Sequence, residues 1–172
     1  MACAAVICLC CAGVGNMYVQ RHGSEGWLFF VFSQKLPAVK GNVLAKNIEY
    51  DYTYLESTDS VTLLATLRTN LAQKPVYSVI DFCDTSYKAP AELIYASPKG
   101  KGFVYRIKTV MPFGIWERMY ACSEPFVVSY EFSSDSVSMV KCSFGYSHGK
   151  WKDNRVKMAS IIETVKFNTG KK

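Results

Sequence analysis

Two runs of alternating apolar and polar residues, on either side of a short turn, constrain the fold of this chain most strongly. The apolar positions are Ile48, Tyr50, Tyr52 and Tyr54 in the first run, and Val61, Leu63, Ala65 and Leu67 in the second. A period of two residues is typical of a β-strand that buries one face. Closing the chain at residues 56–59 pairs Tyr54 with Val61, and the same register pairs every other apolar residue of the two runs. The pattern therefore predicts an antiparallel hairpin over residues 48–67 with its apolar face in the core.

The three tyrosines of the first run have a second interpretation, as an exposed platform on which sugars stack. Their partners across the hairpin are apolar, and an apolar face shared by two strands normally points to the core. We therefore expect the tyrosine row to be buried.

The rest of the chain contains short strand-forming segments rather than alternating strands and helices. The additional predicted strands cover residues 27–33, 76–83, 92–96, 102–110, 126–132 and 137–144. Residues 97–102 and 133–136 have the Ser, Pro, Gly and Asp content of turns, which supports breaks at these points.

Two segments have helical spacing. Between Pro112 and Pro125, a short helix is indicated by Ile115, Trp116, Met119 and Tyr120. A longer helix is expected to begin with Asp153 or Asn154 as its N-cap and to end near Phe167. Its apolar face consists of Met158, Ile161, Ile162 and Val165.

These elements predict a mainly β (α+β) fold. About eight short strands form an antiparallel β-sandwich or a curved sheet, and the C-terminal helix packs on it. An alternating β-α-β order is missing, which argues against a parallel sheet.

Residues 1–15 carry no charge and are almost wholly apolar. The run ends in small residues, Ala12 to Gly15, and so resembles the apolar region and cleavage site of a secretory signal peptide. Cleavage before Asn16 would leave residues 16–172 as a single β-rich domain with a basic C-terminal helix and tail. One element of a signal is missing, because the first Lys or Arg is Arg21.

Two alternatives for the N-terminal segment stay open. The uncharged stretch from Met1 to Gln20 is about as long as a membrane-spanning helix, so it is also a candidate membrane anchor. In the second alternative, the segment is a buried first strand or helix of a cytosolic domain. The signal-peptide interpretation predicts an exported protein, either periplasmic, associated with a bacterial envelope, or secreted.

Four of the seven cysteines lie in residues 1–15, and their removal leaves Cys83, Cys122 and Cys142. No pair of these three has the C-x-x-C spacing of a zinc or redox site. An oxidising compartment permits one disulfide, and Cys122 with Cys142 is the most plausible pair because a predicted hairpin lies between them. Three separated cysteines are more often ordinary buried apolar residues, and this interpretation is favoured over a disulfide.

The net charge of +6 is concentrated at the C-terminus. From Lys150 to Lys172 there are seven basic and two acidic residues, which leaves 13 basic and 12 acidic residues in the rest of the chain (20 − 7 and 14 − 2). A basic helix of this kind can bind an anionic surface or an acidic partner. The other interpretation is a solvated helix face with a lysine tail.

The sequence Gly145-Tyr146-Ser147-His148-Gly149 matches the G-x-S-x-G pattern of the nucleophile turn in α/β-hydrolases. In those enzymes an acid and then a histidine follow the serine along the chain, and no histidine follows His148 here. A serine without a base is a poor nucleophile, so the match favours a simple connection between a strand and a helix.

Nucleic-acid and metal sites have weaker support. Residues 101–105 match part of the aromatic strand of an RNA-recognition motif, but Val104 stands where Gly or Ala is expected and the β-α-β-β-α-β order is missing. We expect Phe103, Tyr105 and Ile107 to face the core instead, with Arg106 and Lys108 toward solvent. The two histidines are far apart, and neither a metal-ligand set nor a phosphate-binding glycine loop is present in the sequence.

No catalytic, cofactor-binding or metal-binding residue is therefore assigned, and no cofactor is expected. The sequence favours a small exported β-rich protein with a non-enzymatic binding or structural role. The alternatives are a serine hydrolase that uses Ser147, with His148 or His22 as its base, and a peripheral protein that attaches to an anionic surface through its C-terminal helix.

Overall fold

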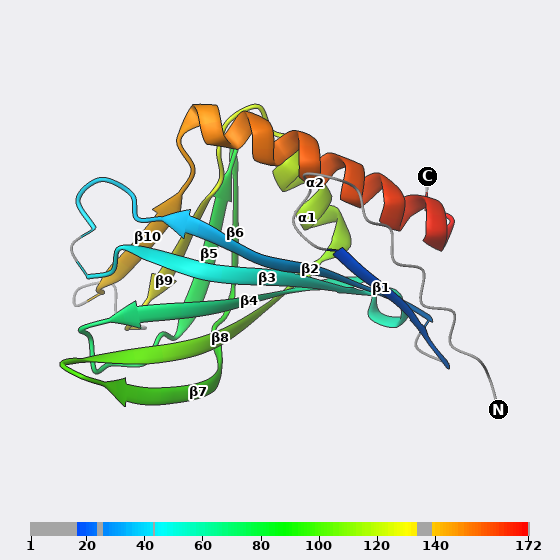
Figure 1. Cartoon of the computed structure of the whole chain (residues 1–172). Coiled ribbons are helices and arrows are strands. Elements are labelled where there is room, and N and C mark those ends of the chain that lie inside the picture. The colour runs from blue at the N-terminus through cyan, green and yellow to red at the C-terminus, as the bar shows by residue number, and fades with distance from the viewer. Residues whose placement is uncertain (1–16, 24–25, 43, 134–138, 172) are drawn as a thin grey trace.

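Two antiparallel β-sheets and two α-helices make up the computed structural model, which describes residues 17–23, 26–42, 44–133 and 139–171 (Figure 1). Sheet A has six strands in the order β1-β2-β3-β4-β8-β7, and sheet B has four in the order β10-β9-β5-β6. The strands of sheet A are β1 (Met17–His22), β2 (Gly26–Pro37), β3 (Asn47–Leu55), β4 (Ser60–Thr69), β7 (Glu92–Lys99) and β8 (Gly102–Pro112). Those of sheet B are β5 (Tyr77–Phe82), β6 (Thr85–Pro90), β9 (Val127–Glu131) and β10 (Lys141–Gly145). The expected β-rich fold with a C-terminal helix packed on antiparallel strands is confirmed.

The predicted hairpin is present as β3 and β4, in the predicted register. Tyr54 pairs with Val61 and Ile48 with Leu67, and every residue of the apolar face is buried. The tyrosine row therefore belongs to the core, because other aromatic side chains cover it: Tyr52 packs against Trp116 and Tyr120, and Tyr54 packs against Phe113.

Ten strands are present in the described part of the chain, compared with about eight expected. The two strands that were not predicted, β1 and β6, both lie at sheet edges. Among the described side chains of these two strands only Val19 and Ala89 are buried, so their sequences lack a clear apolar period. Strand β2 also extends beyond residue 33 to Pro37, with a register irregularity between Val31 and Gln34.

Two α-helices complete the described part of the fold, and they pack against each other. Helix α1 (Phe113–Ala121) confirms the short helix expected between Pro112 and Pro125. Helix α2 (His148–Thr169) runs alongside β2 on one side of the molecule (Figure 1). None of the helices in the described segments is both long and apolar enough to cross a membrane.

The expected start of α2 at Asp153 or Asn154 is wrong, because Ser147 occupies the N-cap position. The amide of Trp151 donates to the Ser147 carbonyl over 2.9 Å, and the Trp151 indole is buried in the core. This indole anchors a first helical turn that the apolar pattern of the following residues does not reveal. The predicted buried face, Met158 to Val165, is confirmed.

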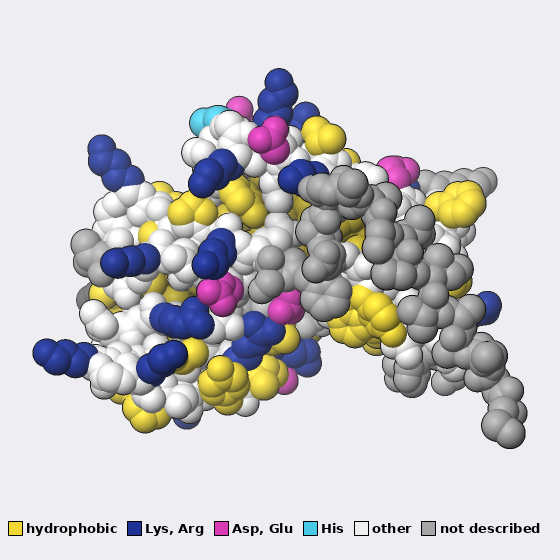
Figure 2. All heavy atoms as spheres, in the orientation of Figure 1, with side chains coloured by type: hydrophobic (Ala, Val, Ile, Leu, Met, Phe, Trp, Pro, Cys, Tyr) yellow, Lys and Arg dark blue, Asp and Glu magenta, His cyan; other side chains and the backbone are white. Residues whose placement is uncertain are grey.

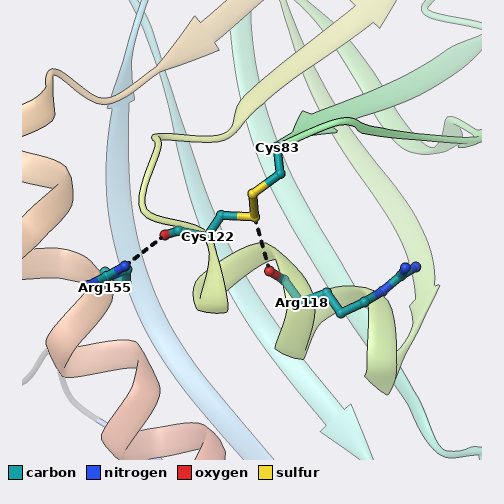
Figure 3. Close-up of a disulfide and its surroundings, with 4 residues drawn as sticks. All are labelled: Cys83, Arg118, Cys122 and Arg155. Carbon is teal, nitrogen blue, oxygen red and sulfur yellow. Dashed lines mark hydrogen bonds between the residues drawn. A yellow bond between two sulfur atoms is a disulfide. The ribbon is translucent and has the colours of Figure 1, made fainter.

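The favoured interpretation of three unpaired buried cysteines is right for Cys142 alone, and the alternative pairing of Cys122 with Cys142 is wrong. Cys122, which follows α1, bonds to Cys83 in the turn between β5 and β6, with their Cα atoms 6.1 Å apart (Figure 3). Cys142 is a free thiol in β10, where its side chain is buried in the core. A hairpin between two cysteines does not make them neighbours, because the end of α1 lies beside the β5–β6 turn rather than beside β10. One disulfide is compatible with an oxidising compartment.

Candidate functional site

A cavity of about 770 Å³ opens at one end of sheet A, where β2 and β4 end and β3 and β8 begin. Small-molecule sites typically occupy about 300–1,000 Å³, so the cavity is large enough for a ligand. Three segments far apart in the sequence line it. The lining residues are Lys35, Ala38, Asn42, Leu44, Ala45, Lys46, Asn47, Glu49, Arg68, Thr69, Asn70, Lys99, Lys101, Gly102, Phe103 and Val104.

The charge of the cavity is strongly positive. Its cationic side chains are Lys35, Lys46, Arg68, Lys99 and Lys101, and its one carboxylate is Glu49. Figure 2 shows Lys and Arg side chains gathered over this end of the molecule, on the left of the view. A cavity with one sign of charge raises the local concentration of oppositely charged ligands.

Two of the lysines lie at the tip of the hairpin that joins β7 and β8. Lys99 pairs with Gly102, so Gly100 and Lys101 form a two-residue turn. Gly100 has a φ of 60°, which fits the first central position of a type II′ turn, where glycine is required. Gly102 allows the hairpin to pack closely on β4, because a Cβ atom there would lie 2.7 Å from the Thr69 carbonyl oxygen. The backbone conformation of this hairpin therefore fixes the Cα positions from which the Lys99 and Lys101 side chains extend.

Glu49 forms ion pairs with two of the other cationic side chains of the cavity, Arg68 and Lys35. Its Oε1 atom lies 3.3 Å from Arg68 NH1 and 3.8 Å from Lys35 Nζ. The Lys35 side chain is 71% exposed and that of Arg68 is 50% exposed. Ion pairs with this exposure contribute about 0–1 kcal/mol each, so an anionic ligand can replace Glu49 at little cost.

The loop between β2 and β3, which carries Lys46, is fixed by Asn42. The Asn42 Nδ2 atom donates to the Ser143 carbonyl of β10 over 3.1 Å, and its Oδ1 atom accepts the Leu44 amide at 3.1 Å. The Ala38 amide donates to the Lys46 carbonyl over 2.9 Å. These bonds connect the wall of the cavity to both sheets.

Amide and apolar groups complete the lining. Within the described part of the chain, the side chains of Asn47 and Asn70 make no hydrogen bond to another residue, so both are available to a ligand. Phe103 and Val104 add apolar surface, and Ala45 is buried between the walls. The cavity thus has a cationic rim with a few polar and apolar contacts, which is the composition of a binding site for an anion.

No protein-family model, curated protein or solved structure matches this chain.

The G-x-S-x-G segment lies where β10 joins α2. Ser147 is exposed, with a φ of −71° and a ψ of 155°, which is ordinary extended backbone rather than the strained turn that presents a hydrolase nucleophile. His148 Nδ1 lies 3.3 Å from Glu124 Oε2, and both side chains are mostly exposed. Among the described residues, nothing hydrogen-bonds to the Ser147 hydroxyl.

The basic C-terminal helix is partly neutralised. Lys166 Nζ lies 2.9 Å from Glu117 and 3.5 Å from Glu163, and Lys171 lies 2.7 Å from Asp59. These pairs raise the pKa of Lys166 above its usual value, chiefly through the hydrogen bond to Glu117. The lysines of the helix without an acidic partner in the described structure are Lys150, Lys152 and Lys157.

The residues expected to face the core in the RNA-recognition-like segment largely do so. Tyr105 and Ile107 are buried, while Phe103 is only partly buried and lines the cavity. Arg106 donates to Asp51 Oδ2 over 2.8 Å and to Thr66 over 2.7 Å on the outer face of sheet A. The described residues contain no group of three or more His, Cys, Asp or Glu side chains that could hold a metal ion.

The cavity itself was not predicted from the sequence. The sequence predicts a turn at residues 97–102, and the two lysines around Gly100 give no reason to expect a site. The available signal was the position of Lys99 and Lys101 on a turn that follows a strand, since such residues point away from the core.

Proposed function

We propose that this protein is a non-enzymatic binding protein whose ligand is a small anion held in the basic cavity. The observation that carries the proposal is the concentration of five cationic side chains around one cavity, with a single carboxylate among them. Lysine and arginine side chains bind phosphate, sulfate and carboxylate groups through charge-assisted hydrogen bonds.

Export is part of the same proposal. The apolar N-terminal segment and the Cys83–Cys122 disulfide both support a protein that acts outside the reducing cytosol. Residues 1–15 lie outside the described residues, so the support from that segment comes from its sequence alone.

The test uses inorganic tripolyphosphate as the probe and isothermal titration calorimetry at low ionic strength. We expect saturable binding with one site per chain. In the K99Q/K101Q double variant, loss of two charge-assisted contacts weakens binding by about tenfold or more.

The matched control is the K150Q/K152Q double variant, which removes the same charge from α2, away from the cavity. Its affinity should equal that of the unmodified chain. Absence of binding, or equal weakening in both double variants, contradicts the proposal. Weakening only in the K150Q/K152Q variant would instead assign binding to the C-terminal helix.

A further inference from the structure

The five cationic side chains of the cavity fall into two groups. Those of the first group form ion pairs with a carboxylate, and those of the second group do not. Arg68 and Lys35 both contact Glu49 Oε1. The lysines without an acidic partner among the described residues are Lys46, Lys99 and Lys101. An incoming anionic group therefore meets the second group of cations unopposed and must displace Glu49 to reach the first.

The two groups are also separated along the sheet. In the register of β4 and β8, Arg68 lies opposite Val104, three residues from Lys101. Three residues of strand span about 10 Å, and long Lys and Arg side chains shorten the gap that a ligand must bridge. A ligand with one anionic group can satisfy one group of cations, whereas a ligand with two or more can contact both.

We infer that the cavity selects ligands that carry two or more phosphate- or sulfate-type groups, and that Glu49 limits the affinity gained from the second group by competing for Arg68 and Lys35. This inference rests on the proposed function, since it concerns the ligand of the same cavity. Glu49 is an internal competitor: it neutralises Arg68 and Lys35 until a second anionic group of the ligand replaces it. A ligand with a single anionic group gains nothing from that exchange, because it contacts the free lysines alone.

Several features of the structure support Glu49 as a replaceable partner. Its side chain is 32% exposed, and it contacts both cations through one oxygen atom at 3.3 and 3.8 Å. By contrast, Asp51 on the same strand contacts Arg106 at 2.8 Å, and a hydrogen bond to Thr66 holds that arginine as well. The ion pairs of Glu49 are thus longer than the pair between Asp51 and Arg106, and of these two carboxylates Glu49 is the one that lines the cavity.

The experiment compares phosphate, pyrophosphate and tripolyphosphate as probes, again by titration calorimetry on the full chain. In the unmodified chain the affinity should rise from phosphate to tripolyphosphate. In the E49Q variant two weak ion pairs are lost, so tripolyphosphate should bind about three- to tenfold more tightly, while phosphate changes little. In the R68Q variant the gain from phosphate to tripolyphosphate should shrink.

The matched control is E92Q, because Glu92 pairs with Lys108 over 2.9 Å on the same sheet but does not line the cavity. E92Q should bind all three probes as the unmodified chain does. Equal effects of E49Q and E92Q, or an equal gain for all three probes in E49Q, would overturn the role of Glu49. The proposed function would still hold in that case if K99Q/K101Q weakens binding, so the two failures are distinguishable.

Discussion

At the scale of single residues, Gln34 connects helix α2 to the core of sheet A. Its Oε1 atom lies 2.7 Å from Asn154 Nδ2 and 3.2 Å from the hydroxyls of both Tyr50 and Tyr146. The two hydroxyls are 2.7 Å apart, and each carries one proton, so one donates to Gln34 and the other to its neighbour. Burial raises the pKa of both tyrosines, so their hydroxyls stay protonated above the pH at which an exposed tyrosine ionises. The irregularity between Val31 and Gln34 in β2 places Gln34 opposite Tyr50.

Replacing this amide tests its contribution. The Q34L variant removes the acceptor shared by Asn154 and the tyrosines and leaves buried donors without a partner, which should lower the free energy of unfolding by about 2–4 kcal/mol. Urea unfolding followed by tryptophan fluorescence measures the change. Q73L, at an exposed position, serves as the control and should change little. A Q34L protein as stable as the unmodified chain would show that the network does not stabilise the fold.

At the scale of elements, the Cys83–Cys122 disulfide joins sheet B to α1, and α1 packs against α2. Arg155 of α2 donates to the Cys122 carbonyl over 3.1 Å, so the residue that carries the disulfide also contacts the second helix (Figure 3). The Cys122 sulfur atom lies 3.3 Å from the Arg118 carbonyl oxygen. The disulfide thus restrains α1, which contacts both sheet A and α2.

Removal of the disulfide should destabilise the protein measurably. For a sequence separation of 39 residues, the chain-entropy model gives a stabilisation of about 4 kcal/mol. The C83A/C122A variant should therefore unfold at lower urea concentration, and a reducing agent should no longer change its unfolding midpoint. In C142A the disulfide remains, so the reductant should still lower the midpoint. Unchanged stability of C83A/C122A would contradict the proposed restraint.

At the scale of the whole molecule, the sequence predicted the centre of sheet A better than its margins. The β3–β4 register was predictable because both strands bury one face continuously, and a slip by one residue would expose all of it. Strands β1 and β6 were missed because, among their described side chains, only Val19 and Ala89 are buried, and the start of α2 was missed because Trp151 precedes the apolar stripe at Met158 by about two turns. Each error concerns an element whose position depends on distant contacts.

The cavity belongs to the same class of features. Its cations come from three stretches of the chain, which are β2 with the loop that follows it, β4, and the β7–β8 hairpin, and each stretch lies more than 20 residues from the next (68 − 46 = 22 and 99 − 68 = 31). Before Lys150 the 13 basic residues are balanced by 12 acidic ones, so composition hides the local excess of positive charge. Only the pairing of β4 with β3 and β8 brings these side chains together.

The most direct test of anion binding in the cavity locates the bound probe on the folded chain. Amide chemical shifts in a ¹⁵N-labelled sample are followed during titration with tripolyphosphate at low ionic strength. We expect saturable shifts in residues 42–47, 68–70 and 99–104, with little change in residues 150–157. Shifts confined to residues 150–157, or no saturable shifts in the cavity residues, would contradict the cavity as the binding site.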